Sequence, residues 1–257
     1  MDTVRDSETM GRWKEAYDRD GYVVIRQFLS GSAFARLQLD LERYIREVVP
    51  SLPDGDAFYE DRSNPQTLKQ LNRLQGDETL AEYLRHPAWN DLARCLLGEA
   101  CQAEGMEWFN KPPGTNHATP PHQDNFYFCL APPQVLTMWL ALDDVDEENG
   151  CLRYVPGSQL RGIRPHLRTT TLGFSQGIPD YTAADYAAEA PIVMSAGDLT
   201  VHHGNTIHRA DANQSTMRHR RSFAMVFRGA SCVRDATAFQ RYLASSKAQR
   251  EEFGLKT

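Results

Sequence analysis

The chain has little cysteine and no long apolar or basic run. Its five cysteines are an odd number without a Cys-x-x-Cys pair, which argues against a disulfide framework and a zinc knuckle, so we expect reduced thiols. No segment approaches the roughly 20 apolar residues that cross a bilayer, and the N-terminal stretch lacks the apolar core of a signal peptide. Lysine and arginine total 28 against 34 acidic residues. We therefore expect a cytoplasmic protein, monomeric or weakly dimeric, without nucleic-acid or membrane partners.

Length and composition favour one domain. The chain has 257 residues, of which 41% are hydrophobic and 24% charged, and its glycines and prolines are spread along it. A chain of this size forms one compact unit, and no linker or internal repeat divides it. We expect a single domain over residues 1–257, with a helical front (1–98), a barrel core (101–230) and a C-terminal surface helix (235–257).

Apolar spacing predicts helices in the first third. Between residues 8 and 50 the pattern changes from helical to a short strand in GYVVIRQF and back to helical up to Pro50. The second of these helices has apolar residues at three- and four-residue steps, as an amphipathic helix requires. A further helical segment is expected over TLAEYLRHPAWNDLARCLLGEA, interrupted near Pro87 and ended by Gly98.

From residue 101 onward the chain reads as many short strands. Apolar runs such as HQDNFYFCL, VLTMWLALDDV and RRSFAMVF are separated every 8–15 residues by turn residues. The stretch from 160 to 190 is looser, with a weak helix near Ala183. Closely spaced short strands favour a sandwich or barrel over alternating strands and helices.

One histidine and one aspartate have the spacing of metal ligands. His122 and Asp124 are two residues apart in a strand-like run, so both side chains are predicted on one strand face. A facial iron(II) site needs two imidazole nitrogens and one carboxylate oxygen, with three positions left open. The third ligand should come from a distant strand, for which His202, His203 and His208 are candidates. The structural alternative is a buried histidine bonded to an aspartate.

An arginine and a serine follow in a later strand-like run. Arg220 and Ser222 are two residues apart, which puts a guanidinium and a hydroxyl on one strand face. A guanidinium fork binds a carboxylate through two bonds. The pair therefore suits the far carboxylate of a dicarboxylic 2-oxo acid.

Four collinear blocks carry a resemblance to a known family. They are DGYVVIRQFLS, NKPPGTNHATPPHQDNFYF, VLTMWLALDDVDEENGCLRYVPGSQ and AGDLTVHHGNTIHRADAN with RRSFA after it. Over roughly residues 20–228 the chain resembles the phytanoyl-CoA dioxygenase family of iron(II)- and 2-oxoglutarate-dependent oxygenases. The resemblance implies a mainly β fold, a double-stranded β-helix or jelly roll with N-terminal helices packed on it. It also implies iron(II), 2-oxoglutarate and O2 as cofactor and cosubstrates.

The resemblance implies roles for particular residues. It places iron on His122, Asp124 and His208, which leaves His202 and His203 as supporting or structural residues. It places 2-oxoglutarate on Arg220, although Arg218 and Arg221 stay open because the family's usual position falls on His219. The other residues expected to bind 2-oxoglutarate are Ser222, Trp139, Thr137 and Gln70, and those expected to bind substrate are Asn125 and Tyr127.

The implied activity is oxidation of a small molecule. We expect hydroxylation, desaturation or epoxidation of an unactivated C–H position in a small-molecule or natural-product substrate, with release of succinate and CO2. Two alternatives remain. One is a 2-hydroxylase of an acyl-CoA, for which only Arg161, Arg164 and Arg168 offer a basic cluster. The other is a catalytically silent jelly-roll binding protein.

Overall fold

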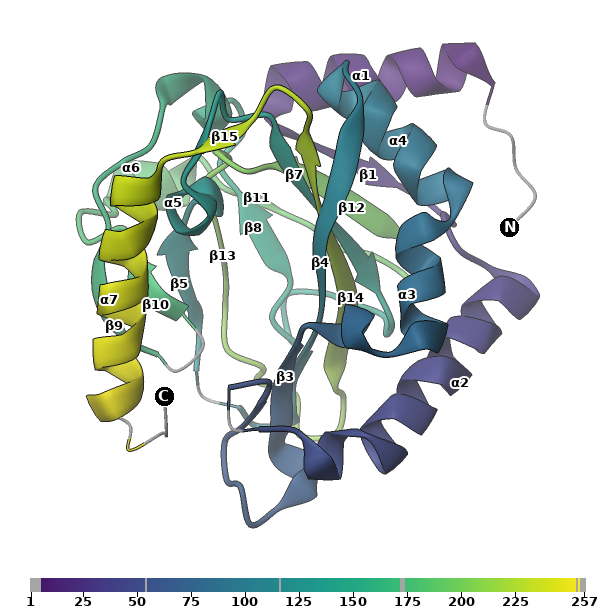
Figure 1. The fold of residues 1–257 in the computed structure, drawn as a ribbon, viewed down its shortest axis with the longest axis vertical. Helices are drawn as coiled ribbons and strands as arrows, with labels where there is room; N and C mark the ends of the chain where they lie inside the picture. Colours follow the sequence, from purple (N-terminus) through teal and green to yellow (C-terminus); the bar gives the residue numbers. More distant parts are fainter. Residues whose placement is uncertain (1–5, 54, 116, 172–173, 253, 255–257) are drawn as a thin grey trace.

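Two antiparallel sheets enclose the centre of the molecule (Figure 1). The structure is a computed structural model that describes residues 6–53, 55–115, 117–171, 174–252 and 254. The larger sheet has seven strands in the order β1-β12-β7-β14-β4-β3-β2, and the smaller has four in the order β11-β8-β13-β5. Residues of both sheets line one cavity, so the sheets face each other as in a jelly roll. The prediction of a mainly β barrel with flanking helices is confirmed.

The elements have the following bounds. The helices are α1 Ser7–Asp20, α2 Gly31–Glu47, α3 Glu78–Arg85, α4 Pro87–Leu97, α5 Asn125–Phe128, α6 Ala183–Ala187 and α7 Ala236–Glu252. The strands are β1 Tyr22–Ile25, β2 Ala57–Tyr59, β3 Leu68–Asn72, β4 Cys101–Lys111, β5 Thr119–His122, β6 Leu130–Ala131, β7 Val135–Ala141, β8 Leu152–Tyr154, β9 Leu167–Thr171, β10 Phe174–Gly177, β11 Ala190–Pro191, β12 Leu199–His203, β13 His208–Ala210, β14 Arg220–Gly229 and β15 Val233–Arg234.

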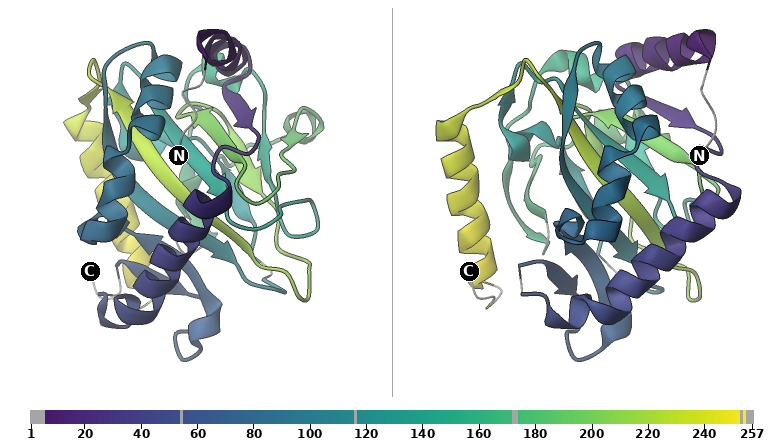
Figure 2. Two further views of the ribbon diagram at one scale, coloured as in Figure 1. Left: turned by 90° about the vertical axis from the view of Figure 1, so that its right-hand side faces the viewer. Right: turned by 45° about the vertical axis from the view of Figure 1, so that its right-hand side comes forward.

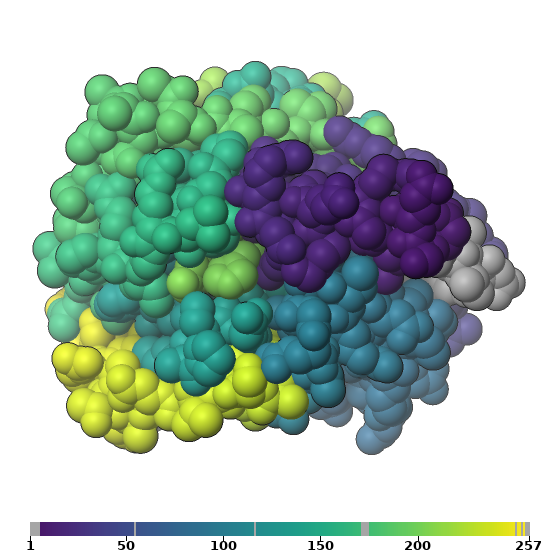
Figure 3. Space-filling view, turned by 90° about the horizontal axis from the view of Figure 1, so that it is seen from above, coloured from purple at the N-terminus to yellow at the C-terminus, as the bar shows by residue number. Residues whose placement is uncertain are grey.

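The helices cover opposite sides of the barrel. Helices α1 to α4 lie on the outer face of the larger sheet, and α7 stands on the other side, next to β9 and β10 (Figure 2). Seen from above, α1 in dark purple lies against α4 in blue, while the C-terminal segment in yellow occupies a separate edge (Figure 3). The predicted helices of the front are confirmed. The break at Pro87 separates α3 from α4, and Gly98 caps α4 in the left-handed conformation.

The larger sheet has an apolar outer face and a more polar inner face. Every residue of β7 is buried, and successive side chains alternate between the two faces. Leu136, Met138 and Leu140 join the core cluster shared with helices α1 to α4. Thr137 and Trp139 line the cavity instead. The same strand therefore supplies both the helix-packing core and the wall of the cavity.

Three features differ from the sequence prediction. The front third contains two strands that the sequence did not predict, β2 and β3, which extend the larger sheet together with the predicted strand β1. The run after His122 is not a strand, since the chain turns into the short helix α5. The C-terminal helix is more than a surface helix, because Tyr242 and Gln249 on α7 help to line the cavity.

The sequence predicts neither disulfide bonds nor membrane-spanning helices. All five cysteines are free thiols, which agrees with the predicted lack of disulfides. Among the described residues, no helix combines the length and apolar character needed to span a membrane.

Gly197 generates a prediction about stability. Its φ is +88°, and a Cβ built on it would lie 2.2 Å from the backbone oxygen of Leu29, whose N–H donates to the Gly197 oxygen. Gly197→Ala should therefore lower the free energy of unfolding by about 1–3 kcal/mol, measured by urea unfolding. Gly11→Ala in α1, where no atom lies within 4 Å of the added Cβ, should instead stabilise the chain by up to about 1 kcal/mol. Equal effects of the two changes would contradict this account.

Candidate active site

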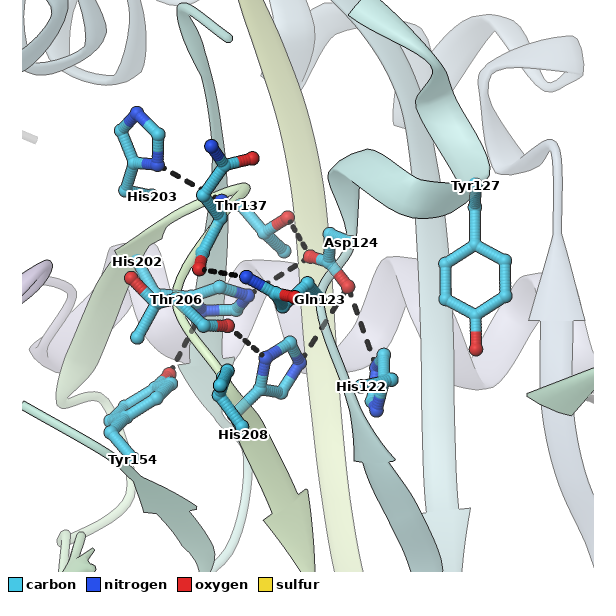
Figure 4. Close-up of polar contacts among 12 residues, drawn as sticks. His122, Gln123, Asp124, Tyr127, Thr137, Tyr154, His202, His203, Thr206 and His208 are labelled. Carbon is cyan, nitrogen blue, oxygen red and sulfur yellow. Dashed lines mark hydrogen bonds and ion pairs between the residues drawn. The ribbon is translucent and has the colours of Figure 1, made fainter. Parts of the chain in front are cut away.

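Two histidines and one aspartate converge inside the barrel. The Nε2 atoms of His122 and His208 lie 3.5 and 3.6 Å from Oδ1 of Asp124, and Figure 4 shows both rings turned toward that carboxylate. Ligands about 2.1 Å from one metal ion and at right angles to each other lie about 3 Å apart. The three atoms therefore fit around a single metal ion with a small adjustment. Within the described residues, this trio forms a group of metal-ligand type.

Backbone register brings the two histidines together. His122 ends β5 and is paired directly with His208, the first residue of β13. Asp124 lies beyond the strand, with φ −57° and ψ −38° at the start of α5. The predicted reason for its position, a shared strand face with His122, is thus wrong. The helical turn, and not strand alternation, directs its carboxylate back toward the imidazoles.

Backbone carbonyls set the tautomer of both histidines. Nδ1 of His122 lies 2.8 Å from the oxygen of Pro120, and Nδ1 of His208 lies 3.0 Å from the oxygen of Thr206. Because a carbonyl oxygen only accepts, Nδ1 carries the proton in each ring. Each Nε2 is then left with a lone pair. Burial, followed by the neighbouring histidines, lowers the pKa of His208 well below its usual value, which keeps this ring neutral.

Hydrogen bonds fix one oxygen of Asp124 and leave the other for a ligand. Oδ2 accepts from Thr137 Oγ1 at 2.6 Å and from His202 Nε2 at 3.0 Å. Tyr154 donates its hydroxyl to His202 Nδ1 at 2.9 Å, which holds that tautomer. Burial alone would raise the pKa of Asp124, but the histidines that surround it, with the hydrogen bond from His202, hold that pKa well below its usual value. The carboxylate is therefore charged, with Oδ1 facing the histidines.

The trio stands in the wall of a cavity of about 220 Å³. The cavity is enclosed by both sheets and by α7. Six aromatic rings contribute to its wall, those of Phe58, Phe109, Tyr127, Phe128, Trp139 and Tyr242. Such an apolar cavity with a few polar groups is typical of a small-molecule site.

Arg220 and Ser222 present unpaired polar atoms in the same region. Nε of Arg220 and Oγ of Ser222 are buried and lack a hydrogen-bond partner in the described part of the chain. The guanidinium carbon lies 5.3 Å from the ring centre of Trp139. Burial lowers the pKa of Arg220 to about 10, so it stays cationic at neutral pH. A buried cation and a hydroxyl without partners fit the carboxylate of a ligand.

The neighbouring arginines point elsewhere. Arg218 forms ion pairs with Asp146 and Glu148, and Arg221 is bonded to Asp143. Of the three arginines left open by the sequence, Arg220 lines the cavity. The geometry favours it over its neighbours.

Four of the other residues predicted to bind cosubstrate or substrate line the cavity. They are Trp139, Thr137, Gln70 and Tyr127. Thr137 donates to Asp124, and the amide of Gln70 donates to Asn72 at 2.9 Å.

Asn125 does not fit the substrate contact predicted for it. Its amide nitrogen donates to the oxygen of Leu130 and to Oδ1 of Asn205, which ties the α5 turn to the neighbouring loop. Asn125 faces a second cavity, beneath α7. The two hydrogen bonds of its amide hold Asn125 on the side of α5 away from the cavity that Asp124 lines.

Several residues that line the cavity were not predicted from the sequence. Glu107 lies on β4 between the buried Met106 and Trp108, so period-two alternation in EGMEWFN could have placed it on the inner face. Tyr242, Ser246 and Gln249 come from α7. No sequence signal placed that polar helix against the cavity.

The fold and the site define a class. The jelly-roll barrel directs two imidazoles and one carboxylate toward a single point. Beside them lies a buried arginine whose Nε has no hydrogen-bond partner among the described residues. This is the architecture of a non-haem iron oxygenase that uses a 2-oxo acid.

Comparisons with known proteins give the family. Residues 17–222 match the family described as phytanoyl-CoA dioxygenase, and the chain belongs to this family of iron- and 2-oxoglutarate-dependent dioxygenases. The peroxisomal phytanoyl-CoA dioxygenase of Bos taurus is 27% identical over 235 residues, which cover 85% of this chain and 68% of that protein. The predicted family and enzyme class are thus confirmed.

Solved structures share the fold. The epimerase SnoN, crystallised with Fe3+, alpha ketoglutarate and nogalamycin RO, superposes with a TM-score of 0.73 at 24% identity, covering 92% of this chain and 90% of that one. EvdO2 from Micromonospora carbonacea var. aurantiaca, complexed with 2-oxoglutarate, gives a TM-score of 0.70 at 23% identity and covers 91% and 94%.

The buried carboxyl of Glu107 gives a pH-dependent prediction. Burial, and then the charge of Asp124, raises the pKa of Glu107 to about 7. The folded chain thus keeps a proton that the unfolded chain loses near pH 4.3, so this group makes stability fall as pH rises from about 4 to 7. Glu107→Gln removes this effect. Its stability relative to the parent should increase between pH 5 and pH 8 by at most about 3 kcal/mol.

The measurement is urea unfolding of the metal-free chain at the two pH values. Glu104→Gln is the matched control, because Glu104 lies on the same strand but pairs with Arg228 and Arg234. A difference between Glu107→Gln and parent that stays constant from pH 5 to pH 8 would show that this carboxyl is not perturbed.

Proposed function

We propose that this chain is an iron(II)- and 2-oxoglutarate-dependent oxygenase that hydroxylates, desaturates or epoxidises an unactivated C–H position of a small-molecule, natural-product substrate. Succinate and CO2 are the coproducts. One observation carries the proposal: the Nε2 atoms of both histidines and Oδ1 of Asp124 converge in a cavity that Arg220 also lines. Among the described residues, Nε of Arg220 has no hydrogen-bond partner, and neither has Oγ of Ser222, two residues further along the same strand. A group of metal-ligand type and a cation for a carboxylate are thus combined in one space.

His122, Asp124 and His208 would hold the iron. Their donor set of two imidazoles and one carboxylate suits iron(II), which would supply the oxidative decarboxylation of 2-oxoglutarate when bound. His202 and Thr137 keep Oδ2 of Asp124 occupied. This arrangement restricts the carboxylate to one ligand atom and keeps the open positions available.

Arg220 and Ser222 would bind the far carboxylate of 2-oxoglutarate. Nε of Arg220 and Oγ of Ser222 are buried and find no hydrogen-bond partner among the residues that the structure describes, so a bound carboxylate would satisfy both. The ring of Trp139 supports the guanidinium from one side. The protein's contribution is to position the reactants and exclude water.

The substrate class follows from the cavity and its surroundings. The aromatic wall suits a compact apolar or mixed molecule, and SnoN, which shares the fold, was crystallised with nogalamycin RO. An acyl-CoA would need free cations for its phosphates. Arg164 pairs with Asp180 and Asp185, and Arg168 pairs with Glu252, which leaves this basic cluster largely neutralised.

Succinate formation tests the function against a silent binding protein. The purified chain is supplied with iron(II), 2-oxoglutarate and O2, alone and with a panel of natural products, and succinate and substrate-derived products are quantified by mass spectrometry. We expect substrate-stimulated succinate with a product that gains one oxygen or loses two hydrogens. No succinate above the level of metal-free protein under any condition would refute the oxygenase assignment.

The metal assignment predicts a contrast between two histidines. His208→Ala should weaken binding of Mn(II) or Fe(II) by more than about tenfold, because it removes a ligand nitrogen. His203→Ala should bind the metal as the parent does, since Nδ1 of His203 accepts from the backbone of Asn205 and takes no part in the trio. Anaerobic isothermal titration gives both affinities. If His203→Ala weakened metal binding and His208→Ala did not, the third ligand would be His203.

The cosubstrate assignment predicts a contrast between two arginines. Arg220→Gln should weaken 2-oxoglutarate binding to the Mn(II)-loaded chain by about 2–5 kcal/mol, because a buried charge loses its partner. Arg218→Gln, which alters an ion pair near the surface, should leave that affinity within a factor of about two. Calorimetry measures both. Equal losses in the two variants would remove Arg220 from the cosubstrate site.

A further inference from the structure

Glu107 places an unassigned carboxyl group in the cavity wall. In the larger sheet it is paired with Asn72 on β3 and with Ala224 on β14. Both of these partners also line the cavity. Paired residues on neighbouring strands point to the same face of a sheet, so the carboxyl group faces the space beside Asp124.

No protein group neutralises this carboxyl. In the described part of the chain, it has no hydrogen-bond donor or ion-pair partner, and the charge that acts on it is the repulsive one of Asp124. Other acidic side chains near the barrel are paired, as Glu189 is with Arg209. An unpaired buried carboxyl group is costly unless a ligand satisfies it.

With metal and cosubstrate bound, the cavity would carry one negative charge without a counterpart. Bound iron(II) would offset the two charges of 2-oxoglutarate, and Arg220 would offset the charge of Asp124. Lys111 does not add a cation here, because it lines a neighbouring cavity and burial lowers its pKa well below the usual value. An ionised Glu107 would therefore be uncompensated, and a cationic ligand would neutralise it.

The rest of the wall suits an ammonium group. Aromatic faces attract cations, and a carboxylate completes such a site. Phe109 lies two residues from Glu107 on the same face of β4, and Trp139 is paired with Ala224 on the neighbouring strand. A cation held by Glu107 would thus have aromatic neighbours.

We propose that Glu107 is a specificity residue that binds a basic nitrogen of the substrate. The inference rests on the proposed function and narrows its substrate class to amines, such as amino sugars or alkaloid-like molecules.

Matched amine and alcohol probes test this inference. The chain is loaded anaerobically with Mn(II) and 2-oxoglutarate, and binding of phenethylamine against 2-phenylethanol, and of cyclohexylamine against cyclohexanol, is measured by ligand-observed NMR. We expect the parent to prefer at least one amine by about tenfold or more, and Glu107→Gln to lose that preference. Glu107→Asp keeps the charge and should retain a preference. Glu104→Gln, a carboxyl of the same strand that is paired on the outside, should behave as the parent does.

The outcomes separate this inference from the proposed function. If Mn(II) and 2-oxoglutarate bind but no amine is preferred over its alcohol, the assignment of Glu107 is wrong and the oxygenase proposal stands. An amine preference that survives in folded Glu107→Gln would overturn the assignment in the same way. If 2-oxoglutarate itself fails to bind, the proposed function fails first.

Discussion

The site depends on how the carboxylate of Asp124 is held. This residue lies on a short helical turn outside either sheet, where nothing in strand geometry would orient it. The hydroxyl of Thr137 and the ring of His202 bind its Oδ2, and both come from neighbouring strands of the larger sheet. The larger sheet thereby fixes this carboxylate against two histidines of the smaller sheet. Loss of either hydrogen bond would free the carboxylate to rotate.

The larger sheet can hold the Asp124 carboxylate because its two faces differ: the outer face is apolar and the inner face carries polar groups. Leucine, methionine and phenylalanine side chains on its outer face pack against α1 to α4 in one apolar core, whose burial stabilises the fold. The inner face can then carry Thr137, Glu107 and Ser222, which would weaken a purely apolar core. The stability of the fold is thus largely separate from the chemistry, and unpaired polar groups are tolerated where a ligand would satisfy them.

Motif spacing and strand alternation predicted much of this arrangement. His122, Asp124 and His208 were placed by spacing together with the family resemblance, and Arg220 and Ser222 share a face because β14 is a regular strand. Alternation fails at α5, where the chain leaves the strand after His122. The resemblance predicts Asn125 as a substrate contact, but its amide is bonded to Leu130 and Asn205. The position of helix α7 against the cavity could not be predicted from its polar sequence. It depends on tertiary contacts with β9 and β10, for which a single sequence carries no pattern.

The geometry of the bound metal is the most direct test of the central claim. Crystals grown anaerobically with iron(II) and 2-oxoglutarate would locate the iron by its anomalous scattering. We predict one iron atom bound by Nε2 of His122, Nε2 of His208 and Oδ1 alone of Asp124, with the far carboxylate of 2-oxoglutarate on Arg220 and Ser222. Iron bound to His202 or His203, or held by both oxygens of Asp124, would contradict the account.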